Sequence, residues 1–380
     1  MAEPRLLDTL AELVRINSVS PSYPGGRPEK FIAAYIRDFF AQRGIETHDQ
    51  EVFPDRPNVV ARLPGRVPGK RIVFEAHTDT VAISGMTIPP FEPTVADGKL
   101  FGRGSCDDKG GLCAMMHALA SLKRDGITPP CEVLLCAAVD EEYSYRGVVK
   151  FCEGLTGQAA VVAEPTDMRV VIAGKGVLRW KVVARGRAAH SSKPHLGVNA
   201  ISHMARVILA FEEEHRALAA RQHPLLGPGT LNVGLVSGGV QVNFVPDECT
   251  IEIDRRLLPG EKPDDVLAGY QRMLDRLKAD APGLNVEQLP PRTRDEGLST
   301  PADAAPVRLA SEILRGLRLN GEPCGVPFGS DASKLSRQGL PSILIGPGSI
   351  DRAHAAVEYV ECDQVEAAFE FYRQFMLRFE

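Results

Sequence analysis

The sequence has few aromatic residues, no long apolar run and no concentration of positive charge. Aromatic residues make up 6% of the 380 residues, with a single tryptophan. Because no stretch of about eighteen consecutive apolar residues occurs, we expect no membrane-spanning helix. Residues 1–5 lead into an amphipathic helix without the apolar stretch of a signal peptide. The net charge of −5 and the lack of basic clusters give no support to nucleic-acid binding.

The eight cysteines are scattered between Cys106 and Cys362 and form no Cys-x-x-Cys pair. In a chain of this length, that spread is typical of reduced, mostly buried thiols rather than of a disulfide framework. We therefore expect a cytoplasmic protein. The remaining composition, 44% hydrophobic and 24% charged, is ordinary for a globular enzyme with a large core.

Apolar periodicity in the first part of the chain alternates between the two regular structures. It predicts helices at residues 6–16, 28–43 and 110–124, and strands at residues 58–63, 71–76, 131–139 and 159–163. Strands that alternate with helices favour a largely parallel sheet covered on both faces. The same alternation returns near the end, with a helix at 306–317, a strand at 342–345 and a helix at 365–379.

A different pattern separates these two parts. It predicts, in order, a strand at 177–185, a helix at 199–215, strands at 230–236 and 249–257, a helix at 263–279 and a strand at 285–289. This βαββαβ order is ferredoxin-like and is able to form a compact insert. We predict an α/β domain in two parts, residues 1–174 and 290–380, interrupted by a smaller domain at 175–289.

Acidic and histidine side chains follow several of the expected strands. They are His77, Asp79, Glu141, Glu142, Glu164 and His354, and Asp107 lies in a glycine-rich loop that opens a helix. In open α/β sheets, ligands bind beyond the carboxyl ends of the strands, so these side chains are expected to converge. Two histidines with four or five carboxylates suit one or two zinc-like ions with an open position for water. The pattern favours a metallohydrolase.

The residue types fit that chemistry locally. Asp140-Glu141-Glu142 follows a buried strand, where adjacent acids are costly unless a positive charge compensates them. The glycines of residues 102–111 allow the tight turn that delivers Asp107 to a helix start. For Asp108 we expect a solvated helix N-terminus, where aspartate is favoured.

These separated motifs resemble one known family. The resemblance covers nearly the whole chain, and its motifs are His77-Thr78-Asp79, residues 102–111, Asp140-Glu141-Glu142, Ala163-Glu164-Pro165-Thr166, and residues 346–348 with His354 and Glu358-Tyr359. The family is that of the two-zinc amidohydrolases and peptidases, which include acetylornithine deacetylase, succinyl-diaminopimelate desuccinylase, aminoacylase and glutamate carboxypeptidase. It implies a zinc-peptidase-like, mostly parallel sheet flanked by helices, with the ferredoxin-like insert as a lid and dimerisation domain.

The resemblance also implies roles for the motif residues. The implied metal ligands are His77, Asp107, Glu142, Glu164 and His354, with Asp107 bridging two divalent ions. These ions are expected to be zinc, with cobalt or manganese as alternatives. By the same resemblance, Asp79 orients the imidazole of His77 and Glu141 is the general base. For Glu358 and Tyr359 we expect packing or support of the ligands.

Residues of the expected insert resemble the family's substrate contacts. His190 matches a lid histidine that stabilises the oxyanion, and in many members this histidine reaches the partner subunit's site. Asn243 and Arg256 match residues that hold a substrate carboxylate, a task suited to the bidentate guanidinium. We expect the neighbouring Arg255 to face solvent. Gly329 and Ser330 match a substrate-side loop.

The sequence departs from the family in two places. Asp108 stands where the family usually has methionine, and Tyr143-Ser144-Tyr145-Arg146-Gly147 stands where glycines are frequent. The second departure reshapes the expected pocket rim and leaves substrate choice open. Trp180, the single tryptophan, is expected to pack within the insert.

The resemblance implies a metal-dependent amidohydrolase that uses metal-activated water to remove an acyl group from an N-acyl amino acid, as acetylornithine deacetylase does. A metallopeptidase (dipeptidase or carboxypeptidase) or a succinyl-diaminopimelate desuccinylase of the same family is an open alternative. An alternative of another class is a catalytically silent metal- or ligand-binding protein, which would be expected to lack Glu141 or a ligand. The expected partners are a small-molecule N-acyl amino acid or dipeptide and a second copy in a homodimer, with no nucleic acid and no membrane.

Overall fold

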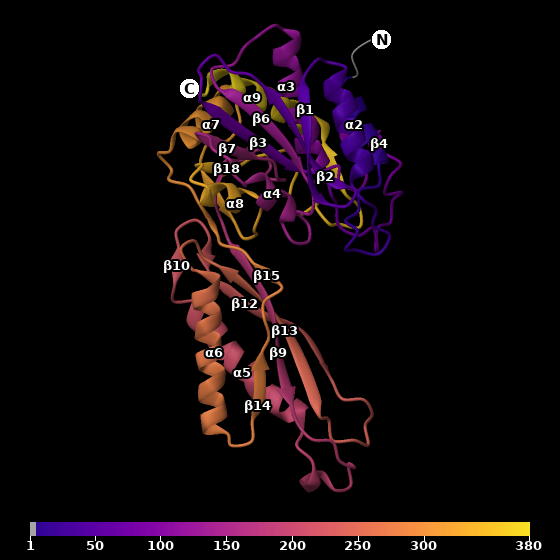
Figure 1. Ribbon diagram of the computed structural model, residues 1–380, viewed down its shortest axis with the longest axis vertical. Helices are drawn as coiled ribbons and strands as arrows, with labels where there is room; N and C mark the ends of the chain where they lie inside the picture. Colours follow the sequence, from indigo (N-terminus) through magenta and orange to yellow (C-terminus); the bar gives the residue numbers. More distant parts are fainter. Residues whose placement is uncertain (1–4) are drawn as a thin grey trace. The chain divides into compact units, whose positions relative to one another are not determined.

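The computed structural model describes residues 5–380, which form two compact units (Figure 1). Of the described residues, unit 1 comprises residues 5–172, Thr300–Cys324 and Ser330–Glu380, and unit 2 comprises Ala173–Ser299 and Gly325–Gly329. Residues 1–4, part of the segment in which we expect no signal peptide, lie outside the described range. Within the described range, no helix is both long and apolar enough to cross a membrane.

Unit 1 is built on a mixed sheet whose centre is parallel. The strands in spatial order are β1 (Glu46–Phe53), β2 (Arg56–Leu63), β6 (Glu132–Ala138), β3 (Arg71–His77), β7 (Ala159–Val162), β18 (Ser342–Leu344) and the start of β8 (Val171–Gly174). Neighbouring strands from β6 to β18 run parallel, and β1, β2 and β8 pair antiparallel towards the edges. The residues that follow β6, β3 and β7 therefore leave the sheet at one edge.

Helices cover both faces of this sheet (Figure 1). A continuous apolar core joins one face to α1 (Leu6–Arg15), α2 (Lys30–Ala41), α3 (Lys109–Arg124), α7 (Ala305–Gly316) and α9 (Cys362–Arg378). Ile72, Phe74 and Ala76 alternate along β3 and all point into this core. The short helices α4 (Arg146–Phe151) and α8 (Ala332–Arg337) contact β6, β7 and β18 and contribute no residue to that core, so they lie on the opposite face. The predicted α/β class is confirmed.

A small second sheet lies beside the glycine-rich loop of unit 1. It consists of β4 (Thr94–Ala96), β5 (Lys99–Phe101) and β19 (Tyr359–Glu361). Val360 pairs with Leu100, so the segment around residue 358 runs beside the chain that enters the loop of Asp107. No periodic pattern of apolar residues marks these three-residue strands.

Unit 2 has the predicted βαββαβ order. Its elements are β9 (Gly176–Arg185), α5 (Ala200–Leu218), β12 (Thr230–Gly238), β13 (Glu248–Leu257), α6 (Pro263–Asp280) and β14 (Asn285–Gln288). The strands pair antiparallel in the order β12-β13-β9-β14, and both helices pack on one face. Trp180 is buried there against Phe211 and Tyr270, with ring centroids 6.0 and 5.0 Å away.

Short elements complete unit 2 and its ends. They are the 3-10 turn η1 (Pro194–Leu196), β10 (Gln222–His223), β11 (Gly227–Pro228), β15 (Thr293–Arg294), β16 (Leu298–Ser299) and β17 (Cys324–Val326). After Pro290-Pro291 the chain pairs once more with β9, through β15. The domain limits at 174 and 289 and the role of unit 2 as a lid stay predictions.

Arg255 is buried, although we expected it to face solvent. Its side chain is 1% exposed and lies on the helix-covered face of β13, in step with Cys249, Ile251, Ile253 and Leu257. Its Nη2 atom donates to both carboxylate oxygens of Glu261, at 2.9 and 3.0 Å, which offsets the cost of burying the charge. The strand alternation already carried this signal, because apolar residues occupy every second position before Arg255.

Candidate metal centre

His77 and Asp107 form the centre of a buried polar cluster in unit 1. His77 is the last residue of β3, and Asp107 lies in the loop before α3; they are 2% and 6% exposed. His77 Nε2 lies 2.9 Å from Asp107 Oδ1, and the other ring nitrogen lies 2.9 Å from the carbonyl oxygen of Asp79. The backbone contact fixes the ring plane and leaves Nε2 directed at Asp107.

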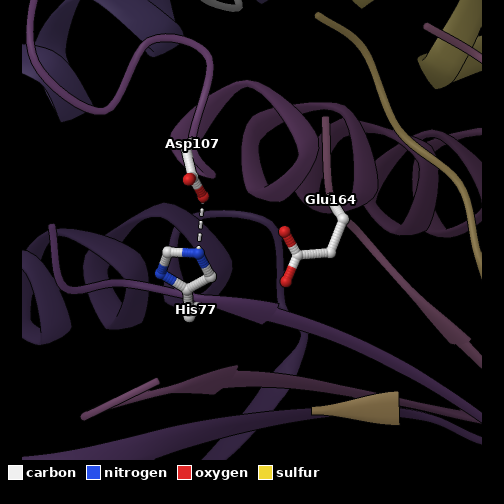
Figure 2. A group of neighbouring side chains, drawn as sticks. All are labelled: His77, Asp107 and Glu164. Atoms are coloured by element: carbon white, nitrogen blue, oxygen red, sulfur yellow. Dashed lines mark hydrogen bonds and ion pairs between the residues drawn. The ribbon is translucent and has the colours of Figure 1, made fainter. Parts of the chain in front are cut away.

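Glu164 completes a first group of three potential ligands. It follows β7, the strand next to β3, and is 4% exposed. Figure 2 shows its carboxylate directed towards the imidazole of His77 and the carboxylate of Asp107. One ligand atom from each of these residues lies within 4.8 Å of the others.

Glu142 and His354 form a second group that shares Asp107 with the first. His354 Nε2 lies 3.1 Å from Glu142 Oε1 and 3.3 Å from Asp107 Oδ2. The potential ligand atoms of this group also lie within 4.8 Å of one another. The two carboxylate oxygens of Asp107 thus face different histidines, a geometry suited to a carboxylate that bridges two sites.

Asp79 holds the segment that carries Glu141 and Glu142. Its fully buried carboxylate accepts hydrogen bonds from the backbone amides of Glu141, at 3.1 Å, and Glu142, at 3.3 Å. Its nearer carboxylate oxygen is 3.7 Å from His77 Nδ1, so the backbone carbonyl of Asp79 is the closer partner of that ring. Asp79 therefore connects the end of β3 to the loop after β6.

The charges of the cluster fit a site for cations. Burial raises the pKa of Glu164 well above its usual range, and the nearby Glu141 and Asp107 raise it further. Burial also raises the pKa of Glu141, although the neighbouring His77 opposes the rise. Burial raises the pKa of Asp107, but hydrogen bonds from His354 and His77 outweigh it and lower the pKa overall. His77, Asp107 and Glu164 are buried, Glu141 and Glu142 are half-buried, and His354 is exposed. Together these four carboxylates and two imidazoles match the ligand preferences of zinc-like ions.

Asp108 is buried, although we expected it to lie at a solvated helix N-terminus. Its side chain is 0% exposed, and neither carboxylate oxygen has a hydrogen-bond partner among residues 5–380. Burial raises the pKa of Asp108 well above its usual range. The packing around Gly111 explains the burial, because a Cβ atom there would lie 2.5 Å from both Asp108 Oδ1 and the Cβ of Ala163. The glycine lets the helix start close over the carboxyl group.

A buried ion-pair network, which no motif of the sequence indicates, supports the loop after β6. Arg56 binds both carboxylate oxygens of Glu29, at 2.6 and 2.7 Å, and its Nη2 lies 3.1 Å from Asp140 Oδ1. Asp140 has a positive φ of 69° and accepts a hydrogen bond from the hydroxyl of Ser144. The network fixes the residue directly before Glu141, and no sequence motif pointed to Arg56 or Glu29.

Arg103 and Glu358 form a second buried ion pair, which supports the backbone at Asp107. Their side chains are 2% and 1% exposed, and Arg103 Nη1 lies 2.5 Å from Glu358 Oε2. The other carboxylate oxygen accepts hydrogen bonds from the backbone amides of Cys106, at 3.1 Å, and Asp107, at 3.2 Å.

His190 and Asn243 lie close together in unit 2. The backbone amide of Ser191 donates to the carbonyl oxygen of Asn243 at 3.0 Å, and His190 pairs with Phe244 in a β-bridge. The His190 side chain is exposed, and its Nδ1 accepts from the backbone amide of Ser192 at 3.2 Å. In a neutral ring this contact places the proton on Nε2, which makes that atom a donor.

The remaining predicted substrate contacts are held by local interactions. Arg256 Nε, on the open face of β13, donates to Asp254 at 2.7 Å. In unit 2, a Cβ atom at Gly329 would approach Val177 to 3.0 Å, so the absence of a side chain permits close packing. In unit 1, Ser330 is 2% exposed and its carbonyl accepts from Lys334 Nζ at 2.9 Å.

Comparisons with known proteins show similarity over nearly the whole chain. The model of the family described as "Peptidase family M20/M25/M40" matches residues 73–378. An acetylornithine deacetylase from Myxococcus xanthus is 31% identical over 374 residues, covering 95% of this chain and 94% of that protein. A probable succinyl-diaminopimelate desuccinylase from Staphylococcus aureus (strain MSSA476) is 25% identical over 413 residues, covering 100% and 98%. The crystal structure of a tripeptidase from Staphylococcus aureus shares the fold with a TM-score of 0.81 at 24% identity, covering 98% of this chain and 97% of that one.

Proposed function

The chain belongs to peptidase family M20/M25/M40, whose members hydrolyse amide bonds, and we propose that it removes an acyl group from an N-acyl amino acid. The observation that supports a two-ion hydrolase is the position of Asp107 between two groups of potential ligands. The choice of an acyl amino acid is supported by the similarity to the acetylornithine deacetylase over nearly the full length of both proteins.

We propose that His77, Asp107 and Glu164 hold one divalent ion, and that Asp107, Glu142 and His354 hold a second. When bound, such ions supply Lewis-acid polarisation of the acyl carbonyl and a nucleophile at neutral pH. Zinc is our first choice, since two imidazoles and several carboxylates suit it, with cobalt and manganese as alternatives.

Glu141 is proposed as the general acid and base. Its backbone is fixed by Asp79 and by the Arg56 network at Asp140, so its carboxylate is presented from a rigid turn. A carboxylate at this place takes the proton of the attacking water and then delivers it to the departing amine nitrogen, which must leave neutral. The amine and the acyl carboxylate are the two products.

Residues of unit 2 are proposed to bind the substrate. Nε2 of His190 would donate to the oxygen that becomes negative as the amide is attacked. Arg256 and Asn243 would hold the α-carboxylate, and Gly329 and Ser330 would border the substrate. This assignment is supported by the exposed position of the His190 side chain.

Amine release from a panel of N-acetyl and N-succinyl amino acids and dipeptides tests this function. Wild-type protein loaded with zinc or cobalt should release amine from acyl amino acids, and Glu141→Gln should lose this activity. Glu153→Gln, an exposed glutamate paired with Lys150, is the matched control and should retain it. Preference for dipeptides would favour a peptidase, and preference for the N-succinyl substrate would favour the desuccinylase. Silence of the metal-loaded protein across the panel would contradict the proposal.

We propose in addition that two copies associate through unit 2. The open edge strand β12 carries Leu235 and Val236, each 63% exposed, and Leu209 on α5 is 60% exposed. Exposed apolar edge strands tend to pair with another chain. Sedimentation should show a dimer for wild type and a monomer for Leu235→Lys. A fully active wild-type monomer would contradict this proposal.

We also propose a cytoplasmic location.

A further inference from the structure

Two tyrosines of unit 1 lie together beside a proposed metal ligand. The rings of Tyr23 and Tyr143 meet edge to face, with centroids 6.0 Å apart and planes at 89°. Tyr143 directly follows Glu142 in the chain and is 41% exposed. The hydroxyl of Tyr23 donates to the carbonyl oxygen of Glu142 at 2.8 Å. An aromatic pair, with Tyr143 exposed and Tyr23 half-buried, therefore borders the ligand that contacts His354.

The loop that carries Tyr23 is stabilised by hydrogen bonds within its own backbone. The amide of Tyr23 donates to the carbonyl of Ser20 at 2.9 Å, and the amide of Gly26 donates to the carbonyl of Tyr23 at 3.0 Å. A Cβ atom at Gly26 would lie 2.2 Å from the carbonyl oxygen of Ser20, so the turn needs glycine there. The amide of Ser20 also donates to the carbonyl of Thr80 at 2.9 Å, which ties this loop to the residue after Asp79.

The loop that carries Tyr143 is held just as firmly. The amides of Ser144 and Tyr145 both donate to the carbonyl of Asp140, at 3.2 and 2.7 Å. The ring of Tyr145 lies 3.2 Å from Lys334 Nζ, a cation–π contact. Tyr143 is therefore presented by a fixed turn. Its exposure has no explanation in the packing of that turn, since its neighbours Ser144 and Tyr145 are both half-buried.

We propose that Tyr23 and Tyr143 form an apolar subsite that binds an aromatic group of the substrate next to the amide bond that is hydrolysed. The inference rests on the proposed function, and it adds the substrate class. An aromatic group is favoured over an alkyl group because a third ring can pack edge to face or offset against an existing aromatic pair. Each loop is anchored before the substrate binds, so little ordering is required.

The experiment compares N-acetylphenylalanine and N-benzoylalanine with N-acetylalanine, using zinc-loaded protein. We expect kcat/KM to be about tenfold higher for at least one aromatic substrate, equivalent to ~1.4 kcal/mol. The arm that shows the preference tells whether the side chain or the acyl group occupies the subsite. Tyr143→Ser should reduce the preference to about twofold, mainly by raising KM for the aromatic substrate, which is the effect expected when substrate binding is lost. Tyr143→Phe should keep the preference of the wild type, because it retains the aromatic ring.

Phe31→Ser is the matched control, because Phe31 is an aromatic residue of unit 1 on α2, is 53% exposed and belongs to neither group of proposed metal ligands. It should leave the preference as in wild type. An equal kcat/KM for aromatic and alanine substrates in wild type, or an unchanged preference in Tyr143→Ser, overturns the subsite while the proposed function stands.

Failure of the proposed function gives a different result, namely no amine release from any acyl amino acid. Titration calorimetry then decides the subsite. Zinc-loaded Glu141→Gln protein should bind N-acetylphenylalanine or N-benzoylalanine more tightly than N-acetylalanine, and the double variant Glu141→Gln/Tyr143→Ser should lose this difference. Equal affinities for the three compounds in Glu141→Gln would overturn the inference.

Discussion

His354 Nε2 lies 3.1 Å from Glu142 Oε1, although 212 positions of the sequence separate the two residues. Burial disfavours a charged imidazole here, but hydrogen bonds to Asp107 and Glu142 outweigh it and raise the pKa of His354 to about 11. Without metal, the protonated histidine thus neutralises part of the acidic cluster. A divalent ion bound by the same residues would replace that proton and supply more positive charge.

Removal of metal should lower the stability of the protein. An ion that binds only the folded protein at about 100 times its Kd adds ~2.7 kcal/mol to the free energy of unfolding. We therefore expect the melting temperature to fall by several degrees in a chelator and to recover with added zinc. Glu164→Gln should shrink this difference, whereas Glu153→Gln should keep it. Identical melting curves of wild type with and without chelator would contradict the metal centre. Scanning fluorimetry measures these temperatures.

Loss of the buried ion pairs of Arg56 should both destabilise the protein and slow it. Arg56→Met leaves the carboxylates of Glu29 and Asp140 buried without the positive charge that they pair with, which typically costs ~3–5 kcal/mol. The turn before Glu141 loses a support, so kcat should fall more than KM changes. Arg62→Met is the control, because the Arg62 side chain is 44% exposed and its pair with Glu132 should contribute about 1 kcal/mol or less. Denaturant unfolding and steady-state kinetics test both effects, and equal losses in the two variants would argue against a special role of Arg56.

The sequence indicated which potential ligands lie near one another, but it did not indicate the residues that surround them. His77, Glu142 and Glu164 could be grouped because each follows a buried strand, and parallel strands deliver such residues to one edge. The contact between Arg103 and Glu358 spans 255 positions and depends on the pairing of two three-residue strands, which carry no periodic signal. The burial of Asp108 depends equally on packing, since local preference alone favours aspartate at an exposed helix start.

The same contrast holds for the fold. Long amphipathic helices and strands were predicted with their order, including the βαββαβ pattern of unit 2. The order of strands in the sheet of unit 1 was not predicted, because β18 inserts beside β7 from the far end of the chain. Strand β1 was also missed, since its side chains are exposed or half-buried and no apolar alternation marks it.

Tyr270 should make the stability of unit 2 fall at alkaline pH. Burial raises the pKa of Tyr270 to about 12 even though Arg255 lowers it, compared with ~10 in an unfolded chain. Below pH 10 the hydroxyl is protonated in both states, so its contribution is intact. Between pH 10 and 12 the unfolded chain ionises first, and stability is lost. Trp180, 5.0 Å from Tyr270, is the single tryptophan and reports unfolding of this unit.

Tyr270→Phe is the matched variant for this effect, since it keeps the ring that packs on Phe211 and Trp180 and removes only the ionisable group. Urea unfolding followed by Trp180 fluorescence should show a smaller loss of stability from pH 10 to 12 in the variant than in wild type. The other tyrosines and the lysines titrate in both proteins. The difference between the two curves therefore removes their contribution to the loss of stability. Parallel curves would show that Tyr270 ionises normally.

Glu358 should control metal affinity through Asp107 without touching the metal itself. Glu358→Gln preserves the shape of the side chain but removes the charge opposite Arg103 and weakens the acceptor for the amide of Asp107. Groups that orient metal ligands typically change affinity by about 10–100-fold when they are replaced. We expect a loss of zinc affinity in that range, measured by competition with a chromophoric chelator.

The control for this prediction is Glu366→Gln, an exposed glutamate on α9 that should bind zinc as wild type does. Because the buried charge of Arg103 is left unpaired, Glu358→Gln should also melt at a lower temperature, so affinity must be measured where both proteins are fully folded. A variant that melts earlier but binds zinc like wild type would limit Glu358 to the stability of the fold. Weakened binding under those conditions would instead show that the orientation of Asp107 depends on a residue 251 positions away.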